Sequence, residues 1–282
     1  MKITVLIEND RAADHPELVP EFGLSMLVEH AGSRILFDAG ATGEAVRNAE
    51  RLGVDLGQVD ACVLSHHHFD HGGGLPAFLA VNARAKVFLR PPSVGKETFR
   101  ALLVVSRFVG LDPALFERYR ERLAYVESPT EILPGVQLLT DIVREYPLPR
   151  GDRYLYLKRP DGYVLDPFDH ELVLAVREDD GIVVFTGCAH SGVLNMVRTV
   201  TRRFPGERIK AVVGGFHLIG VPGLEATGET RQATQALGEA MLGMPVDAWW
   251  TGHCTGHRAS ALLQTVLGAR LRELHTGTTL TL

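Results

Sequence analysis

Cysteine is scarce in this chain: Cys62, Cys188 and Cys254 are the only three among 282 residues. An odd number of widely spaced cysteines is not the pattern of a disulfide-stapled secreted domain. The first strand-like run, over residues 2–7, also lacks the length and the small-residue cleavage site of a signal peptide. We therefore expect reduced thiols and a cytoplasmic protein.

Two further absences narrow the class of protein. No stretch approaches the roughly 18 unbroken apolar residues of a membrane span, so we expect no membrane partner. Acidic residues outnumber basic ones, 34 to 29, so a general grip on nucleic-acid phosphates is not expected either. The 45% hydrophobic and 22% charged residues are typical of a globular protein, and the length permits one large α/β domain or two small ones.

What the chain does have is a dense run of metal-binding side chains. Residues 66–74 read His-His-His-Phe-Asp-His-Gly-Gly-Gly. In an extended loop, side chains at i and i+2 point the same way, so His66 and His68 face one ion. Asp70 and His71 lie where the chain turns into a helix, and they face a second ion. Imidazole and carboxylate ligands suit Zn²⁺, with Fe or Mn as alternatives.

An expression tag or a surface histidine patch also gives such a run. Tags lie at termini, whereas this run is internal and is flanked by folded-looking sequence over 63–65 and 75–79. We therefore interpret it as a metal site. His67 points away from its two neighbours in an extended loop, and we exclude it as a ligand.

Apolar runs and turn residues predict strands alternating with helices, and we expect a single α/β domain over residues 1–282. Strands are expected at 2–7, 24–29, 34–37, 59–64, 86–89, 135–140, 171–176, 182–185, 209–213 and 248–250. Helices are expected at 44–52, 75–81, 193–203, 228–242 and 259–267. Residues 91–125 are predicted to be a helical insertion, with helices over 99–109 and 113–123, that shapes a pocket.

The second half repeats one theme: an apolar strand, a glycine, then a histidine. His190, His217 and His253 follow strands in this way. A lone histidine there is usually structural, but three beside an existing cluster favour a shared site. We expect His190 to join His66 and His68, and His253 to join Asp70 and His71. Two divalent ions would then lie roughly 3.5–4 Å apart with a bridging hydroxide.

These motifs resemble the metallo-β-lactamase superfamily. The match rests on His66-x-His68-x-Asp70-His71 after an apolar strand, on residues 36–40 (Leu-Phe-Asp-Ala-Gly) and on residues 251–253 (Thr-Gly-His). The resemblance spans nearly the whole chain. It implies a four-layer αββα sandwich with a dinuclear metal centre, in which Asp38 braces the metal loop by hydrogen bonds.

A narrower resemblance is to the subfamily named for 7,8-dihydropterin-6-ylmethyl-4-(β-D-ribofuranosyl)aminobenzene 5′-phosphate synthase. It rests on four segments, residues 21–25, 187–192, 214–218 and 252–256. One departure from the superfamily pattern is clear: after Thr-Gly, Cys188 stands where many hydrolases of the superfamily carry a carboxylate that bridges the metals. Cys188 is a thiolate ligand or a small buried residue, and we favour the second.

Other assignments stay open. His170 rivals His190 as third histidine, since other branches of the superfamily place that ligand beside this strand. Glu171 is a candidate for orienting the metal ligands through hydrogen bonds, without binding the metal itself. His217 is a candidate for binding substrate, for donating a proton or for closing its own loop. We take Asp70 and His217 as the candidate catalytic side chains.

The leading hypothesis is a dinuclear metal enzyme that acts on a small anionic, phosphate-bearing substrate through a metal-bound hydroxide, with a pterin-type molecule as one candidate substrate. Ester hydrolysis and a synthase-type transfer that releases pyrophosphate both fit. A diiron redox protein is less favoured, because His68 stands where such members keep a carboxylate. A non-catalytic metal sensor is disfavoured by the intact ligand set.

Overall fold

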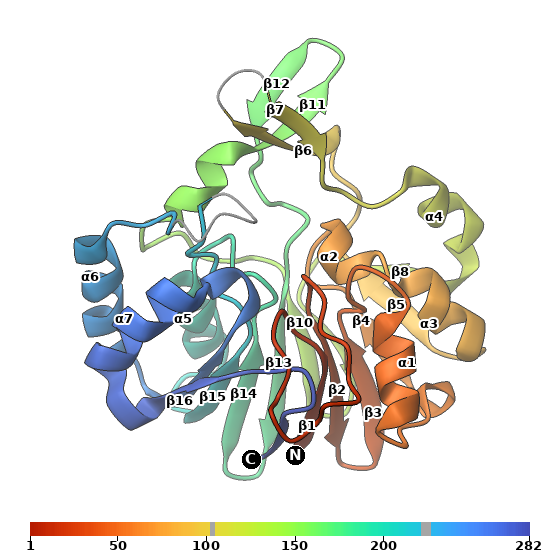
Figure 1. The fold of residues 1–282 in the computed structure, drawn as a ribbon, viewed down its shortest axis with the longest axis horizontal. Coiled ribbons are helices and arrows are strands. Elements are labelled where there is room, and N and C mark those ends of the chain that lie inside the picture. The colour runs from red at the N-terminus through yellow and green to blue at the C-terminus, as the bar shows by residue number, and fades with distance from the viewer. Residues whose placement is uncertain (102–104, 221–226) are drawn as a thin grey trace. The chain divides into compact units, whose positions relative to one another are not determined.

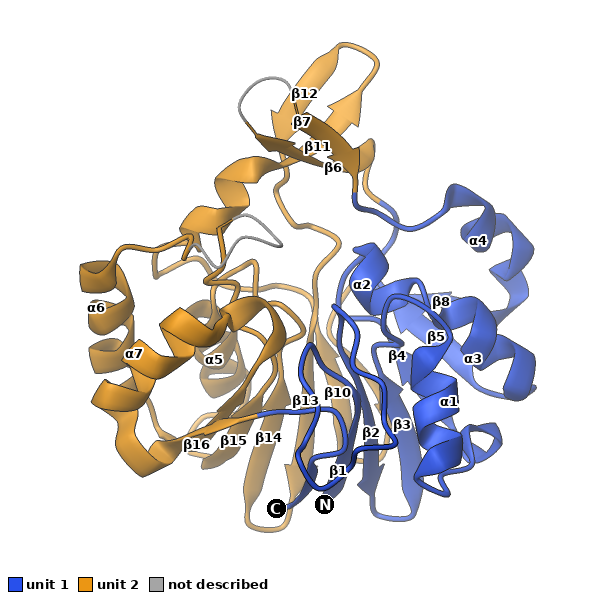
Figure 2. Cartoon of the chain, viewed as in Figure 1, with its two compact units in different colours: residues 1–92, 109–127, 274–282 blue, residues 93–108, 128–273 orange. Residues whose placement is uncertain are grey.

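The chain folds as two compact units, shown in different colours in Figure 2. The computed structural model describes residues 1–101, 105–220 and 227–282. Unit 1 comprises residues 1–92, 109–127 and 274–282, and unit 2 comprises residues 93–108 and 128–273. Each unit has its own large sheet and its own apolar core. The single domain expected over the whole chain stays a prediction.

Unit 1 is built on a seven-stranded mixed sheet. In order across the sheet, its strands are β18 (Thr279–Thr281), β1 (Lys2–Ile7), β2 (Ser25–His30), β3 (Ser33–Phe37), β4 (Ala61–Val63), β5 (Lys86–Leu89) and β8 (Leu123–Tyr125). The strands from β18 to β3 pair antiparallel, and those from β3 to β8 pair parallel. Parallel strands are usually covered on both faces, which explains why β4 is wholly buried and apolar.

Helices cover this sheet (Figure 1). They are α1 (Glu44–Arg51), α2 (Phe69–Gly72), α3 (Leu75–Val81) and α4 (Pro113–Arg118), with short 3₁₀ turns at η1 (Leu56–Gln58) and η2 (Arg120–Arg122). Ala49 of α1 and Phe78 of α3 pack in one core with Leu36 of β3 and Val87 of β5. The helical apolar spacing that predicted α1 and α3 is the face that this core buries.

Unit 2 contains a second seven-stranded mixed sheet. Its strands, in order, are β17 (Leu271–Glu273), β16 (Val246–Thr251), β15 (Ile209–Val213), β14 (Gly181–Phe185), β13 (Val173–Glu178), β10 (Val136–Leu139) and β9 (Thr130–Leu133). Its helices are α5 (Val193–Arg203), α6 (Arg231–Leu242) and α7 (His257–Leu267), with 3₁₀ turns at η4 (His253–Thr255) and η5 (Gly268–Arg270). The strands β14, β15, β16 and β17 run parallel, so the loops that leave β14, β15 and β16 emerge at one edge.

The prediction of a helical insertion over residues 91–125 is wrong in the first part of this segment. Residues 99–109 were expected to be helical, but β6 (Lys96–Ala101) and β7 (Val105–Phe108) form an antiparallel pair there, and residues 102–104 lie outside the described residues. They join β11 (Leu155–Arg159) and β12 (Gly162–Leu165) in a four-stranded sheet, which the 3₁₀ turn η3 (Arg150–Tyr154) precedes.

The reason is tertiary. Residues 96–99 of β6 pair with β11, which lies far away in the sequence, and residues 98–101 pair with β7. This sheet pairing overrides an apolar spacing that also suits a helix. In the second part of the segment, α4 covers only Pro113–Arg118 of the predicted 113–123. Among the helices of the described ranges, none combines the length and the apolar character that crossing a membrane requires.

The three glycines after the histidine cluster allow close packing of the chain. A Cβ on Gly74 would lie 2.0 Å from the carbonyl oxygen of Ala39 and 2.3 Å from that of Thr42. A Cβ on Gly73 would lie 2.3 Å from the carbonyl oxygen of Ala41. These neighbours are backbone atoms, which cannot swing away as a side chain does. The glycines therefore let the loop of residues 39–42 press against the start of α3.

We predict that Gly74→Ala lowers the free energy of unfolding by about 1–3 kcal/mol, because the new methyl group must displace backbone. Gly243→Ala is the matched control, since its Cβ would make only an ordinary 3.4 Å contact with Ala240. The control should change stability by less than about 0.5 kcal/mol. Urea denaturation of both variants measures the difference, and equal stabilities would contradict the packing argument.

Candidate metal centre

The histidine cluster forms a buried loop in unit 1. It begins three residues after β4 ends and leads into the single turn of α2. His66 and His71 are 0% exposed, and His68 and Asp70 are each 6% exposed. Burying so many polar groups is unfavourable unless they have partners or bind a cation. The burial therefore separates this loop from a solvated histidine patch.

The four predicted ligands of this loop face one another. Nε2 of His66 lies 3.1 Å from Nδ1 of His68. The rings of His66 and His71 have centroids 4.2 Å apart, and Nε2 of His71 lies 3.9 Å from Oδ2 of Asp70. Ring nitrogens and a carboxylate oxygen gathered at these distances are the donor types that divalent transition metals bind.

Asp38, the residue that follows β3, braces this loop. One of its carboxylate oxygens accepts the backbone N–H of Ser65 at 2.7 Å. The other accepts the Ser65 hydroxyl at 2.7 Å and Nδ1 of His71 at 2.6 Å. Because Nδ1 of His71 donates to Asp38, Nε2 is left as the ring nitrogen that coordinates a metal. The structure thus gives Asp38 a bracing geometry.

In unit 2, loops at one edge of the sheet bring further donors together. His190 follows β14, His217 follows β15 and His253 follows β16. The ring of His190 is stacked on Phe168, with centroids 4.1 Å apart and planes 6° apart. The ring of His217 also lies 4.1 Å from that of His190. Rings on both sides fix the orientation of His190.

Two carboxylates hold His190 in place. Oδ1 of Asp152 accepts a hydrogen bond from Nδ1 of His190 at 2.8 Å. The same oxygen lies 3.4 Å from Nε2 of His217. Glu171 accepts the backbone N–H groups of His190 and Ser191 at 2.8 and 2.7 Å. Burial raises the pKa of Asp152 to about 8 and that of Glu171 to about 7. Carboxylates of this kind orient metal-binding histidines from behind.

Both cysteines of unit 2 lie among these donors. The ligand atoms of Cys188, His190 and His217 all lie within 4.8 Å of one another. Those of Cys188, His253 and Cys254 form a second such group. Sulfur and imidazole ligands are the set that zinc sites prefer. The donor chemistry of this cluster therefore fits a divalent metal ion.

Two further histidines considered as metal ligands from the sequence, His170 and His67, have other neighbours. Nε2 of His170 lies 3.2 Å from Oδ2 of Asp166, and no metal-binding group found within the described ranges includes His170. His67 places its ring 5.5 Å from that of Phe116. The structure thus puts His190, rather than His170, in a metal-binding group.

The backbone of both clusters is strained. Asp38, Ala189, His217 and His253 are non-glycine residues with positive φ, between 47° and 57°. Such conformations cost free energy, and they persist where the surrounding structure demands them, often at functional sites. Here they occur at the bracing carboxylate and in the three loops that carry donors.

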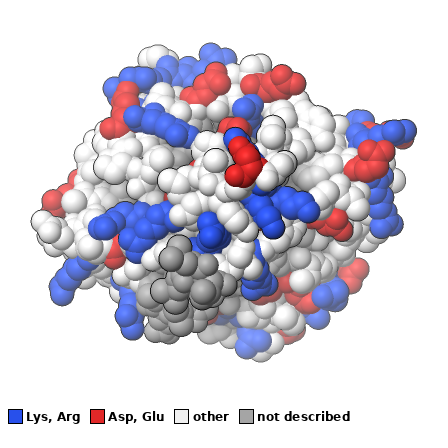
Figure 3. Space-filling model, turned by 90° about the horizontal axis from the view of Figure 1, so that it is seen from above, with Lys and Arg blue, Asp and Glu red and all other residues white. Residues whose placement is uncertain are grey.

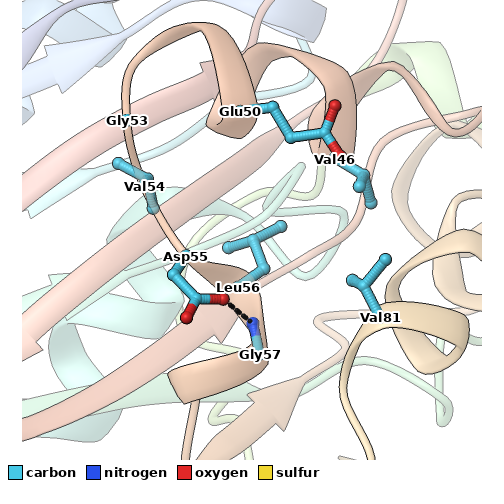
Figure 4. A pocket seen from close by; sticks show the side chains of 8 residues that line it. All are labelled: Val46, Glu50, Gly53, Val54, Asp55, Leu56, Gly57 and Val81. Carbon is cyan, nitrogen blue, oxygen red and sulfur yellow. Dashed lines mark hydrogen bonds between the residues drawn. The ribbon is translucent and has the colours of Figure 1, made fainter.

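A cavity elsewhere in unit 1 is not part of this chemistry. It has a volume of about 340 Å³ and is lined mainly by apolar side chains of α1, η1 and α3, with the two carboxylates Glu50 and Asp55 (Figure 4). Asp55 accepts the backbone N–H of Gly57 at 2.8 Å. None of the predicted ligands lines this cavity.

Asp152 and Cys254 were missed in the sequence. Asp152 stands in an Arg-Gly-Asp-Arg stretch that matches no metal or catalytic motif, and its role depends on histidines that are distant in the sequence. Cys254 had a signal that was available, namely its place directly after His253. A cysteine next to a predicted metal ligand is itself a candidate ligand.

These features agree with a comparison of the chain to known protein families. The model of the metallo-beta-lactamase superfamily matches residues 18–93, which include Asp38 and the whole histidine loop. The chain belongs to the metallo-β-lactamase superfamily, and its two mixed sheets flanked by helices have the fold of that superfamily. The expected fold class is confirmed.

Particular relatives narrow this class. The chain is 29% identical over 289 residues to the 7,8-dihydropterin-6-methyl-4-(β-D-ribofuranosyl)-aminobenzene-5′-phosphate synthase of Methanocaldococcus jannaschii, covering 98% of this chain and 95% of that enzyme. It is 30% identical over 223 residues to an uncharacterized protein of the same archaeon, covering 78% of this chain and 80% of that protein.

A solved structure also matches along the whole chain. It is a metal-dependent hydrolase of the beta-lactamase superfamily, with a TM-score of 0.82 and 28% sequence identity, and the match covers 100% of this chain and 99% of that one. Together with the buried donor clusters, this likeness identifies a metal-dependent enzyme of the metallo-β-lactamase fold with a histidine-rich buried metal site.

We predict that Asp38→Asn weakens metal binding about 10- to 100-fold, because an amide has one acceptor oxygen where the carboxylate uses two for the His71 and Ser65 hydrogen bonds. Competition with a chromophoric chelator measures the affinity. The exposed Asp14→Asn, which carries the same change of charge, should leave it unaltered. Equal affinities for the two variants would show that Asp38 does not position the ligands.

Proposed function

We propose that this protein is a dinuclear metal-dependent hydrolase that acts on a small phosphate-bearing ester. The ligands we assign are His66, His68, Asp70, His71, His190 and His253. Zn²⁺ is the ion that best suits this donor set, with Fe and Mn as alternatives. The proposal rests on the burial of these imidazole and carboxylate donors. Further carboxylates, Asp38 and Asp152, form hydrogen bonds with two of the histidines.

Bound divalent ions would supply two things: a lowered pKa for a coordinated water and positive charge against a phosphate. The chain supplies orientation. Asp38 fixes the ring of His71, and Asp152 fixes the ring of His190. Because these hydrogen bonds already exist, the side chains need little reorganisation when the metal or the substrate binds.

His217 is the side chain we assign to proton transfer. Asp152 lies 3.4 Å from its Nε2, while Nδ1 has no hydrogen-bond partner among the residues that the structure describes. A histidine whose ring is oriented by a carboxylate through one nitrogen is suited to act as a general acid. His217 then protonates the leaving oxygen. Asp70 is the carboxylate assigned to accept the proton of the attacking water.

The substrate we propose is small and anionic, and neither nucleic acid nor a membrane is proposed as a partner. The chain has a net charge of −5. On the face seen in Figure 3, Lys and Arg side chains are interspersed with Asp and Glu. Mixed charge of this kind differs from the continuous basic surface that typically binds nucleic-acid phosphates.

A transferase is the second candidate, and the observation that favours it is the 29% identity to the pterin-related synthase over 98% of the chain. In that case the same metal ligands would hold a pyrophosphate leaving group. The two candidates differ in a measurable product. Hydrolysis of a chromogenic phosphodiester supports the hydrolase, whereas pyrophosphate release from a pterin substrate, with no ester hydrolysed, supports the transferase.

We predict that His66→Ala abolishes phosphodiester hydrolysis, because it removes a donor of the proposed metal set. A colorimetric phosphodiesterase assay measures this loss. The matched control is His257→Asn, since His257 is exposed at the start of α7. Undiminished hydrolysis in the His66→Ala variant would contradict the proposed site.

For His217→Asn we expect kcat to fall about 10²- to 10⁴-fold with metal content unchanged, as for the loss of a general acid. Steady-state kinetics and elemental analysis of the same sample give both quantities. Loss of metal along with activity would make His217 a ligand instead. An unaltered kcat would remove it from the mechanism.

A further inference from the structure

Two thiols and an imidazole form a compact group within unit 2. A ligand atom from each of Cys188, Cys254 and His253 lies within 4.8 Å of the other two. The three residues are no more than 3% exposed. Two sulfurs and a nitrogen around one zinc ion stand roughly 3.5–4 Å apart, given the usual bond lengths and tetrahedral angles. Small side-chain adjustments therefore suffice to close this group around an ion.

The fold makes room for the sulfur of Cys254. A Cβ on Gly215 would lie 2.4 Å from that sulfur, so only glycine leaves the space that Cys254 fills. The backbone N–H of His217 donates to the same sulfur at 3.3 Å. Amide hydrogen bonds to sulfur are a recurring means by which proteins stabilise a metal-bound thiolate.

A buried cysteine is more often structural than reactive, and Cys254 does contact a carbonyl oxygen, that of Cys188, at 3.6 Å. Cys62 shows what a structural cysteine looks like in this chain. It lies in β4 within the aliphatic core of unit 1 and belongs to no metal-binding group found in the described ranges. Cys254, by contrast, adjoins a second thiol and an imidazole.

We propose that Cys188 and Cys254 are sulfur ligands of the metal ion that His253 binds, which makes this a thiolate-containing site with a preference for Zn²⁺ and other soft or borderline cations. The inference deepens the proposed function and rests on it, because His253 is a ligand in both. When each sulfur–metal bond forms, the thiol proton passes to the buffer. Cys254 is thereby assigned a role as a metal ligand.

Cobalt substitution tests this inference without an activity assay. Metal-free protein is titrated with Co²⁺, and its absorption spectrum is recorded. Visible d–d bands report bound cobalt whatever the ligands are, whereas a near-ultraviolet sulfur-to-cobalt charge-transfer band appears only with thiolate ligands. The wild-type protein should show both, and so should Cys62→Ala, the matched control.

Cys188→Ala and Cys254→Ala should each lower the charge-transfer band by about half, and the double variant should lose it while keeping a native circular dichroism spectrum. The wild-type spectrum alone decides the matter if a variant does not fold. Bound cobalt with no charge-transfer band overturns this inference and leaves the proposed metal enzyme standing. A band that survives in the double variant also overturns it. No bound cobalt at all overturns both.

Discussion

The hydrogen bonds of the Asp38 carboxylate are the interaction on which the rest of the account depends. The carboxylate is fully buried and accepts the backbone and hydroxyl groups of Ser65 together with Nδ1 of His71. An isolated buried carboxylate would be costly, so these donors stabilise the charge and fix the loop in the same contacts. The left-handed backbone conformation of Asp38 is tolerated because these contacts hold the loop in place. The close packing at Gly73 and Gly74 fixes the same loop.

Unit 2 uses the same principle with a different scaffold. Parallel strands deliver His190, His217 and His253 to one edge of a sheet, and Asp152 and Glu171 hold the first of these loops. Parallel sheets collect loops from distant parts of a sequence, which makes them suited to assembling donors. The apolar core of this unit includes the wholly buried Trp249.

Part of the fold and part of the metal site were predictable from the sequence. The histidine loop is local, because four donors within six residues define a metal pattern without tertiary information. His190 and His253 were predicted from their places after apolar strands. Asp152 and Cys254 carry no local signal of that strength, since each acts through side chains from other loops. The prediction for residues 99–109 fails for a related reason: these residues form a hairpin whose first strand also pairs with the distant strand β11, and this pairing overrides their helical apolar spacing.

The zinc content of the purified protein, measured after dialysis against a metal-free buffer, distinguishes a dinuclear site from a group of donors that binds no metal. We expect two ions per chain, retained because buried, pre-oriented donors bind divalent metals tightly. Elemental analysis combined with a protein concentration from amino-acid analysis gives this ratio. A value below one ion per chain, in protein expressed with zinc, iron and manganese and shown to be folded, would contradict the account.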